Sequence, residues 1–311
     1  MDTTTIFTTI LALVLVFLFA IQKFTHQIEV VAGEKLKAIL NSWTNKPLKG
    51  ILSGAFVTSI LQSSTAVSVI LVGLVNGGLI PAYNAVAVVV GANIGSTVTA
   101  QLIALNMTFI APMVVIAGFI LSHTHSRLRR YGKAVFYFGI IFLSLFIIQN
   151  LVQPLKDNEA FVGFLGSLDN PYSAIIVGAV LTAIFQSSAV LTGLVLILAG
   201  SSLVGLPMAI GFLLGAAIGA PMTAIIASMS ASIEAKKVAI AHLFFNILGF
   251  AIFFSIMPFF AKMLQFTSGN LVQQIVNAHF IFNITTAILC FVFFKQFERL
   301  VRRATSAMYR K

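Results

Sequence analysis

Long apolar runs separated by short polar stretches make up most of this chain. Several of the runs approach or exceed the roughly 20 residues with which an α-helix crosses a bilayer. The pattern therefore predicts an all-α polytopic membrane protein. The apolar segments cover residues 6–22, 51–75, 79–105, 109–122, 134–152, 172–199, 203–229, 238–260 and 275–294.

The start of the chain contains one segment of a different kind. Residues 27–49 are polar, carry four lysines and contain Trp43, a pattern typical of a helix lying in the membrane interface. The residues before the first apolar run are acidic at Asp2, whereas a signal peptide has a positive leader and a small-residue cleavage site. We expect residues 6–22 to be a retained first transmembrane helix.

Composition supports the membrane assignment and excludes several functions. Hydrophobic residues make up 59% of the chain and charged residues 9%, with a mean hydropathy of +1.03; soluble domains have about 25% charged residues. The net charge of +11 lies in loops, as the positive-inside bias predicts, so we expect no nucleic-acid partner. The single cysteine, Cys290, allows no internal disulfide and makes redox chemistry improbable.

The basic residues fall into four clusters, and placing all four in the cytoplasm accounts for 17 of the 19 lysines and arginines. Only Lys156 and Lys262 then lie outside. This assignment predicts an external N-terminus and a cytoplasmic C-terminus in a plasma membrane, the inner membrane of a bacterium. The clusters are Lys23, Lys35, Lys37, Lys46 and Lys49; Arg127, Arg129, Arg130 and Lys133; Lys236 and Lys237; and Lys295, Arg299, Arg302, Arg303, Arg310 and Lys311.

The charge assignment requires two segments that enter the membrane and turn back. Three apolar segments separate Lys49 from Arg127, although both residues lie inside. Two segments separate Lys156, outside, from Lys236, inside. One segment of each half therefore does not cross. The segments that contain Q-S-S solve both halves, so we expect two re-entrant hairpins; in the first half the competing choice is the short segment 109–122.

The two halves are internally similar at an offset of 124 positions, the spacing of Gln62 and Gln186. By the charge count the first copy starts from the cytoplasm and the second from outside, which makes the copies inverted. Inverted repeats with broken helices are typical of secondary transporters, whose site lies near the midplane. We divide the chain into a first helix with an interfacial segment (1–49), repeat one (50–152), repeat two (153–294) and a basic cytoplasmic tail (295–311).

The Q-S-S stretches offer chemistry for an anion and for a cation. A hairpin tip presents free N–H groups at a helix start, where anions such as phosphate bind. It also offers hydroxyl, amide and carbonyl oxygens, which suit sodium. No acidic residue lies at mid-membrane depth, which favours a metal cation over a proton as the coupling ion.

Structural readings compete with these assignments. Small and hydroxyl residues let membrane helices approach closely, and for the pairs Gly91/Gly95 and Gly215/Gly219 we favour close packing over a helix break. The A-H-x-x-F-N stretches at 241–246 and 278–283 place His and Asn on one helix face. For them we favour packing that locks scaffold helices, and no ligand set completes a zinc site.

These motifs resemble those of the type II sodium–phosphate cotransporter family, whose hallmark is a duplicated Q-S-S-S-A hairpin followed by G-x-N-I-G-T-T-x-T-A and later by A-x-x-H-x-x-F-N. Here repeat one reads Q-S-S-T-A at 62–66 and G-A-N-I-G-S-T-V-T-A at 91–100. Repeat two reads Q-S-S-A at 186–189 and G-A-A-I-G-A-P-M-T-A at 215–224. The resemblance covers about residues 50–294.

The resemblance implies where the substrates bind. In that family the two tips meet at mid-membrane and form the phosphate site, with sodium close by. Phosphate would then contact Gln62, Ser63, Ser64, Thr65, Gln186, Ser187 and Ser188. Sodium would contact Gln186, Ser187, Ser188 and Thr223 in the second half, with Asn93, Ser96, Thr97 and Thr99 as looser candidates in the first.

The second repeat departs from the family pattern. The fourth tip serine is Ala189, the asparagine is Ala217, and the paired threonines are Ala220 and Pro221. These losses remove oxygen donors from one side, and they leave the number of sodium ions and the identity of the anion open. The chain also ends at Lys311, without the cytosolic phosphate-regulator domain that some bacterial relatives append.

The leading hypothesis is a sodium-coupled symporter of inorganic phosphate that works by alternating access in the lipid bilayer, with no other cofactor. Phosphate efflux, transport of another oxyanion, and a non-transporting scaffold or sensor with a decayed site are the alternatives; a homodimer is one possible assembly. An intramembrane hydrolase is disfavoured because no His or carboxylate adjoins Q-S-S, so we expect no enzyme.

Overall fold

The computed structural model describes residues 3–105, 107–124, 128–167 and 170–309, and every regular element in these ranges is helical. Six of the helical stretches are long and apolar enough to cross a membrane. They are Thr4–Ser42, Ala82–Ala104, Arg129–Asp157, Leu206–Ser228, Ile233–Ser255 and Leu271–Val292. The all-α class and the multiple membrane-spanning helices predicted from the apolar pattern are confirmed.

The helices of the first half are α1 (Thr3–Ser42), α2 (Pro47–Leu61), α3 (Ser64–Asn76), α4 (Ala82–Gly95), α5 (Thr97–Ala104), the 3-10 turn η1 (Met107–Ile110), α6 (Ala111–His123) and α7 (Arg129–Val152). Those of the second half are η2 (Gln153–Asp157), α8 (Glu159–Ser167), α9 (Pro171–Phe185), α10 (Ser188–Gly200), α11 (Leu206–Gly219), α12 (Met222–Ser228), α13 (Ile233–Ser255), α14 (Met257–Gln265), α15 (Leu271–Val292) and α16 (Phe294–Tyr309).

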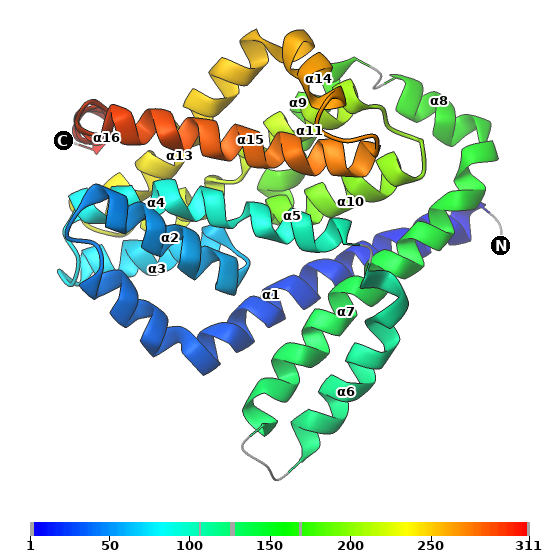
Figure 1. Cartoon of the computed structure of the whole chain (residues 1–311), viewed down its shortest axis with the longest axis horizontal. Helices are drawn as coiled ribbons and strands as arrows, with labels where there is room; N and C mark the ends of the chain where they lie inside the picture. The colour runs from blue at the N-terminus through cyan, green and yellow to red at the C-terminus, as the bar shows by residue number, and fades with distance from the viewer. Residues whose placement is uncertain (1–2, 106, 125–127, 168–169, 310–311) are drawn as a thin grey trace.

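The first helix is longer than the sequence pattern indicates, because α1 continues to Ser42 and so takes in most of segment 27–49, while residues 47–49 begin α2. No proline precedes Pro47, so nothing in this stretch breaks the helical hydrogen bonds. Figure 1 shows that α1 changes direction along its length. Phe17 belongs to a core shared with α7, whereas Leu36 and Leu40 join the core around α4. The two parts of α1 thus pack against different neighbours.

Two helix pairs are held together by glycines at matching places in the two halves. A Cβ on Gly91 of α4 would lie 1.8 Å from the carbonyl oxygen of Ile51 on α2, and a Cβ on Gly215 of α11 would lie 2.1 Å from that of Ile175 on α9. Only glycine permits this approach between backbones. The close packing favoured for these glycines is therefore present, and so is the alternative of a helix break, because α4 ends at Gly95 and α11 ends at Gly219.

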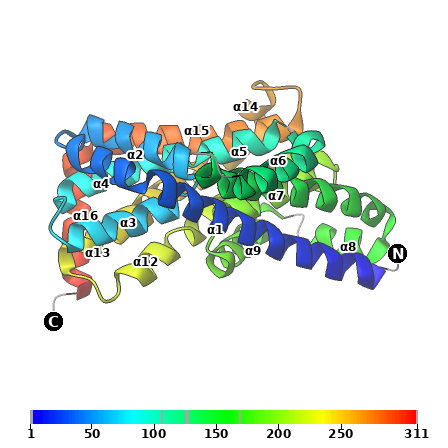
Figure 2. The ribbon, with the colours of Figure 1, turned by 90° about the horizontal axis from the view of Figure 1, so that it is seen from below.

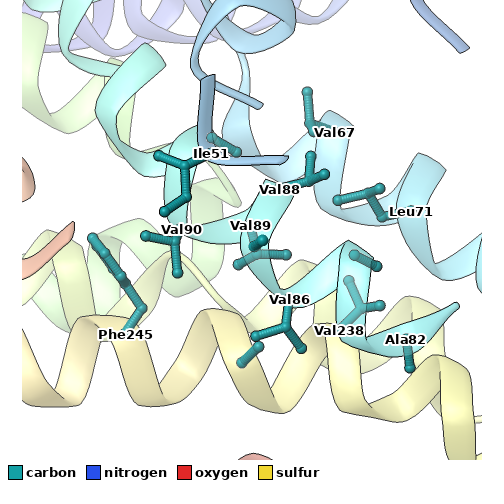
Figure 3. Packing of buried hydrophobic residues seen from close by; sticks show 14 of the residues in the cluster. Ile51, Val67, Leu71, Ala82, Val86, Val88, Val89, Val90, Val238 and Phe245 are labelled. Carbon is teal, nitrogen blue, oxygen red and sulfur yellow. The ribbon is translucent and has the colours of Figure 1, made fainter. Parts of the chain in front are cut away.

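Helix α4 is the most enclosed part of the first half. Residues 85–90 read A-V-A-V-V-V, and each of these side chains is at most 1% exposed. A helix that is apolar on every side is buried on every side. Figure 3 shows Val86, Val88, Val89 and Val90 packed among Val67 and Leu71 of α3 and Val238 and Phe245 of α13. This core fixes α4 relative to the α2–α3 hairpin.

Elements of both halves lie at each end of the long axis. Helices α2, α3 and α4 lie at one end with α16 of the second half, and α8 lies at the other end with the N-terminal part of α1 (Figure 1). Helix α16 lies at the first end and crosses it nearly perpendicular to α15 (Figures 1 and 2). The expected tail is thus mostly a helix, with Phe294, Phe297 and Val301 buried against the bundle and Arg302 and Arg303 exposed.

Candidate functional site

Each Q-S-S stretch forms the tip of a helical hairpin. Gln62 ends α2 in the left-handed region with φ 57°, and the extended Ser63 then begins α3 by accepting a hydrogen bond on Oγ from the Ala66 N–H at 3.1 Å. Gln186 and Ser187 repeat this arrangement between α9 and α10, with φ 53° and a 3.4 Å bond from the Val190 N–H. The chain reverses within two residues at both tips.

Glutamine is an unusual residue at this backbone position. Left-handed backbone favours glycine, because a Cβ there is crowded. Both tips nevertheless carry glutamine, with the same φ to within a few degrees. Both side-chain amides make a local contact: Nε2 of Gln62 donates to the Ser59 carbonyl, and Oε1 of Gln186 accepts from Thr223 at 3.4 Å.

The two tips meet around one small cavity, which we call the tip cavity. Its volume is about 30 Å³, room for one or two water molecules. All seven residues that the resemblance implies for phosphate line it, together with Ser96 and Thr99 from the junction of α4 and α5. The predicted phosphate residues are Gln62, Ser63, Ser64, Thr65, Gln186, Ser187 and Ser188.

The tip cavity is rich in hydrogen-bond donors. The N-termini of α3 and α10 both border it, and first-turn N–H groups have no carbonyl partner within their own helix. Two helix N-termini add two partial positive charges. Its lining contains no Asp, Glu, Lys or Arg among the described residues. This combination suits a small oxyanion held by dipoles and hydroxyl groups.

The residues proposed for sodium are placed less uniformly. Thr223 donates to Oε1 of Gln186 at 3.4 Å, which joins α12 to the second tip. Thr99 lines the tip cavity, and its buried Oγ1 has no partner among the described residues. Thr97 instead donates to the Ile94 carbonyl at 2.8 Å and lines neither cavity at the tips.

A second cavity of about 30 Å³ adjoins the first, and we call it the amide cavity. Asn93, Asn246 and Asn283 line it, each at most 4% exposed. It shares Ser64, Ser96, Ser188, Thr192 and His279 with the tip cavity. Thr192, Asn246, His279 and Asn283 were not among the predicted site residues. The paired A-H-x-x-F-N motif could have indicated three of them.

The two histidines of that motif differ in their surroundings. Nδ1 of His242 lies 3.1 Å from the Ser68 hydroxyl, which ties α13 to α3. His279 lines both cavities, and its buried Nδ1 has no partner among the described residues. The expected locking role fits His242. The asparagines bond to the backbone of their own helices rather than to the histidine rings.

A wider opening lies on the far side of Ile103, which borders both it and the tip cavity. This cleft has a volume of about 530 Å³ and is lined by parts of α5, α7, α10 and α15, including Gln149 and Gln273. Nε2 of Gln273 donates to Oε1 of Gln101 at 3.4 Å and to Oδ1 of Asn277 at 3.0 Å. The cleft is large enough to admit a hydrated anion.

Comparisons with known proteins give a family and several relatives. The family described as Na+/Pi-cotransporter matches residues 16–150 and 157–282. "Uncharacterized protein YqeW" of Bacillus subtilis is 32% identical over 295 residues, which is 93% of this chain and 95% of the relative. "Putative inorganic phosphate export protein YjbB" of Escherichia coli is 25% identical over 88% of this chain, which spans about half (51%) of that relative.

A shorter stretch matches mammalian proteins. "Sodium-dependent phosphate transport protein 2A" of Rattus norvegicus is 36% identical over 75 residues, 24% of this chain and 12% of the relative. No solved structure matches the chain.

Proposed function

The chain belongs to the Na+/Pi-cotransporter family, and from that premise we propose that it is a sodium-coupled secondary transporter of inorganic phosphate. The resemblance inferred from the motifs is confirmed, and the family is one of transporters rather than enzymes. The family and the six apolar helices make the chain a multi-pass membrane protein. The transported substrate, the coupling ion and the direction of transport are what we propose.

The observation that carries the proposal is the tip cavity. Residues 124 positions apart in the sequence meet there, with two helix N-termini and hydroxyl groups around a space that no charged side chain lines among the described residues. A dianion held without arginine or lysine relies on such dipoles. The cavity is smaller than phosphate requires, so we infer that the tips separate to admit it.

We further propose that α2–α3 and α9–α10 are re-entrant hairpins of two inverted repeats. Each of these helices has 13 or 15 residues, too few for a full crossing, and each pair reverses at a Q-S-S tip. The tips of the two pairs line the same cavity. Such repeats alternate access by rocking around a fixed central site.

The same proposal sets the orientation in the membrane. With both hairpins turning back, the short helix α6 must cross together with the adjoining turn η1. The protein then lies in the inner membrane of a bacterium with its N-terminus outside the cell and α16 in the cytoplasm. Lys236 lies over the ring of Tyr309 at 4.4 Å, so two of the basic clusters are neighbours in space.

The decisive test is uptake of radiolabelled phosphate by sealed proteoliposomes that contain the purified chain. We expect accumulation that depends on an inward sodium gradient and disappears when potassium replaces sodium. Protein-free liposomes and liposomes with collapsed gradients are the controls. Absence of accumulation under every cation gradient, with folded protein in sealed vesicles, would contradict the proposal.

Phosphate export is the second candidate, because the Escherichia coli relative is named as a phosphate export protein. The two directions use the same site and differ in the sign of the net driving force. Cells that overproduce the chain should accumulate phosphate if it imports. Loss of preloaded labelled phosphate from such cells, faster than from cells without the chain, would favour export.

A further inference from the structure

The amide cavity adds three buried asparagines to the serines that it shares with the tip cavity. Each of its three asparagines donates Nδ2 to the carbonyl four residues earlier: Asn93 to Val89 at 2.9 Å, Asn246 to His242 at 3.0 Å and Asn283 to His279 at 2.8 Å. A side-chain amide has its donors on nitrogen and its lone pairs on oxygen. With one N–H of each nitrogen used and turned toward its own helix backbone, each asparagine has Oδ1 and a second N–H left for other partners.

A hydroxyl group adds to this set of acceptors. Ser96 donates its hydroxyl hydrogen to the Asn93 carbonyl at 2.7 Å, which leaves lone pairs on Oγ. Among the described residues, none donates a hydrogen bond to Oδ1 of Asn93, Asn246 or Asn283. The cavity therefore gathers neutral oxygen acceptors from three helices, α4, α13 and α15, and from the residue after α4. Hard cations take such oxygen ligands.

The composition of the cavity follows the internal repeat. Its lining pairs Ser64 with Ser188, and the positions of Asn93 and Ser96 with those of Ala217 and Ala220. Asn246 pairs with Asn283 across the two A-H-x-x-F-N motifs. Repeat two thus supplies no side-chain oxygen at Ala217 and Ala220. In the same cavity, Asn246 of α13 and Asn283 of α15 supply two amide oxygens.

We propose that the amide cavity is a sodium site whose ligands include Oδ1 of Asn93, Asn246 and Asn283 with Oγ of Ser96. This inference rests on the proposed sodium–phosphate function and moves its coupling ion away from the Gln186–Thr223 contact. Asn246 and Asn283 become ligands rather than scaffold. The volume of about 30 Å³ accepts a single small ion.

The shared serines explain how the cation site could raise the affinity of the anion site. Ser64 and Ser188 line both cavities. A serine hydroxyl has one hydrogen and two lone pairs, so each serine can direct its oxygen to sodium and its hydrogen to phosphate. Each ion then orients the hydroxyls for the other and attracts it electrostatically. Such coupling is reciprocal, because each ligand raises the affinity of the other by the same factor.

The test is equilibrium binding of radioactive sodium to the purified full chain without phosphate. We expect saturable binding to the natural chain. Asn283→Leu and Asn246→Leu should each weaken it by at least the roughly 10- to 100-fold that loss of a partner outside the ligand shell costs. The matched control is Asn150→Leu on α7, because exposed Asn150 makes the same backbone bond, to Phe146 at 2.9 Å. Sodium binding should be unchanged in this variant.

Phosphate binding at saturating sodium checks that the variants are folded, since mass action compensates for a weakened sodium site. Sodium binding that is absent in the natural chain, or unchanged in Asn283→Leu and Asn246→Leu, would overturn the assignment. Failure of the transport proposal looks different. There the natural chain binds sodium and the asparagine variants lose it, but proteoliposomes accumulate no phosphate.

Discussion

At the scale of single residues, the serines and the glutamines of the tips have different structural roles. Ser63 and Ser187 cap α3 and α10, a role that any helix beginning at that place would need. Gln62 and Gln186 hold a left-handed backbone that glycine would adopt more easily. The serines are therefore explained in part by structure, and the glutamine amides in part by their contacts with Ser59 and Thr223, while the left-handed backbone at both glutamines favours a further role in the site.

Ser63→Ala and Gln186→Ala should each abolish sodium-dependent phosphate uptake while the protein stays folded in the membrane. Ser63→Ala loses a helix cap worth about 1 kcal/mol, which a protein with this much buried helix tolerates. Uptake by proteoliposomes and elution as a single species on size exclusion are the measurements. Wild-type uptake by both variants would remove the tips from the site.

Gln186→Gly separates the amide from its backbone. Glycine relieves the strain of the left-handed backbone, which is roughly 1–2 kcal/mol for residues with a Cβ. The melting temperature of the Gln186→Gly protein should therefore equal or exceed that of the Gln186→Ala protein. Uptake should still be lost, because the amide is gone. Recovery of uptake in the glycine variant would mean that only the turn geometry matters at this position.

Sequence reasoning reached these residues because the motif occurs twice at one spacing. It could not predict that Oδ1 of Asn246 and Asn283 would be left without a protein donor, because that depends on whether the amide nitrogen or the amide oxygen bonds to the helix backbone. Thr97 was included from its place in a motif, yet the turn of α5 directs it to Ile94 instead. Motif spacing identifies candidates, and hydrogen-bond partners distinguish among them.

At the scale of the elements, glycines determine how closely the helices of each half approach. The pairs α2–α4 and α9–α11 have backbone-to-backbone contacts at equivalent glycines. Helices α6 and α7 use the same device, since a Cβ on Gly118 would lie 2.2 Å from the Phe136 nitrogen. The sequence indicated small-residue packing, but not which helix each glycine faces, because partners depend on tertiary structure.

Gly91→Ala should destabilise the protein severely. Its Cβ would overlap the Ile51 carbonyl at 1.8 Å, forcing α4 away from α2; overpacking costs about 1–3 kcal/mol and occasionally more. Gly73→Ala is the matched control, because the same added methyl group meets nothing within 4 Å on α3. It should be neutral, or stabilising by about 0.5–1 kcal/mol. Thermal unfolding in detergent measures both, and equal melting temperatures would contradict the close packing.

At the scale of the whole molecule, the distribution of charge was readable from sequence, whereas the extent of α1 and the helix α16 were not. Composition marks 27–49 and 295–311 as polar, but polarity does not distinguish a flexible tail from a helix whose one apolar face is covered. The residues that decide are Phe297 and Val301, buried against the bundle. The domain boundaries at 49, 152 and 294 remain predictions.

Single cysteines at Arg129 and Lys236 should react with an impermeant maleimide only from the cytoplasmic face, and one at Lys262 only from outside. The natural Cys290 is 1% exposed and can stay in place. Arg127, which belongs to the same predicted cluster as Arg129, lies outside the described residues. Labelling of Lys236→Cys from outside would contradict the inverted repeats. Lys156 and Lys236 would then lie on the same side, and the chain between them would have to cross the membrane an even number of times.

The wide cleft should lie on the transport path. A Gln149→Cys variant, with its new thiol in the cleft, should lose phosphate uptake when a charged impermeant thiosulfonate is added outside. Asn150→Cys, one residue further along α7 and outside the cleft, is the control. Equal sensitivity of the two variants, or of neither, would mean that the cleft is not used.

The alanines at 217 and 220 have a consequence for energy conversion. Without oxygen ligands at these two positions, the amide cavity has a single set of ligands from Asn93, Ser96, Asn246 and Asn283, which favours one cation beside the anion. One sodium ion with divalent phosphate forms a complex with one net negative charge. A voltage of 100 mV, negative inside, opposes entry of that charge by about 2.3 kcal/mol and assists its exit equally. The membrane potential would then drive phosphate out of the cell, and import would require a sodium gradient steep enough to exceed it.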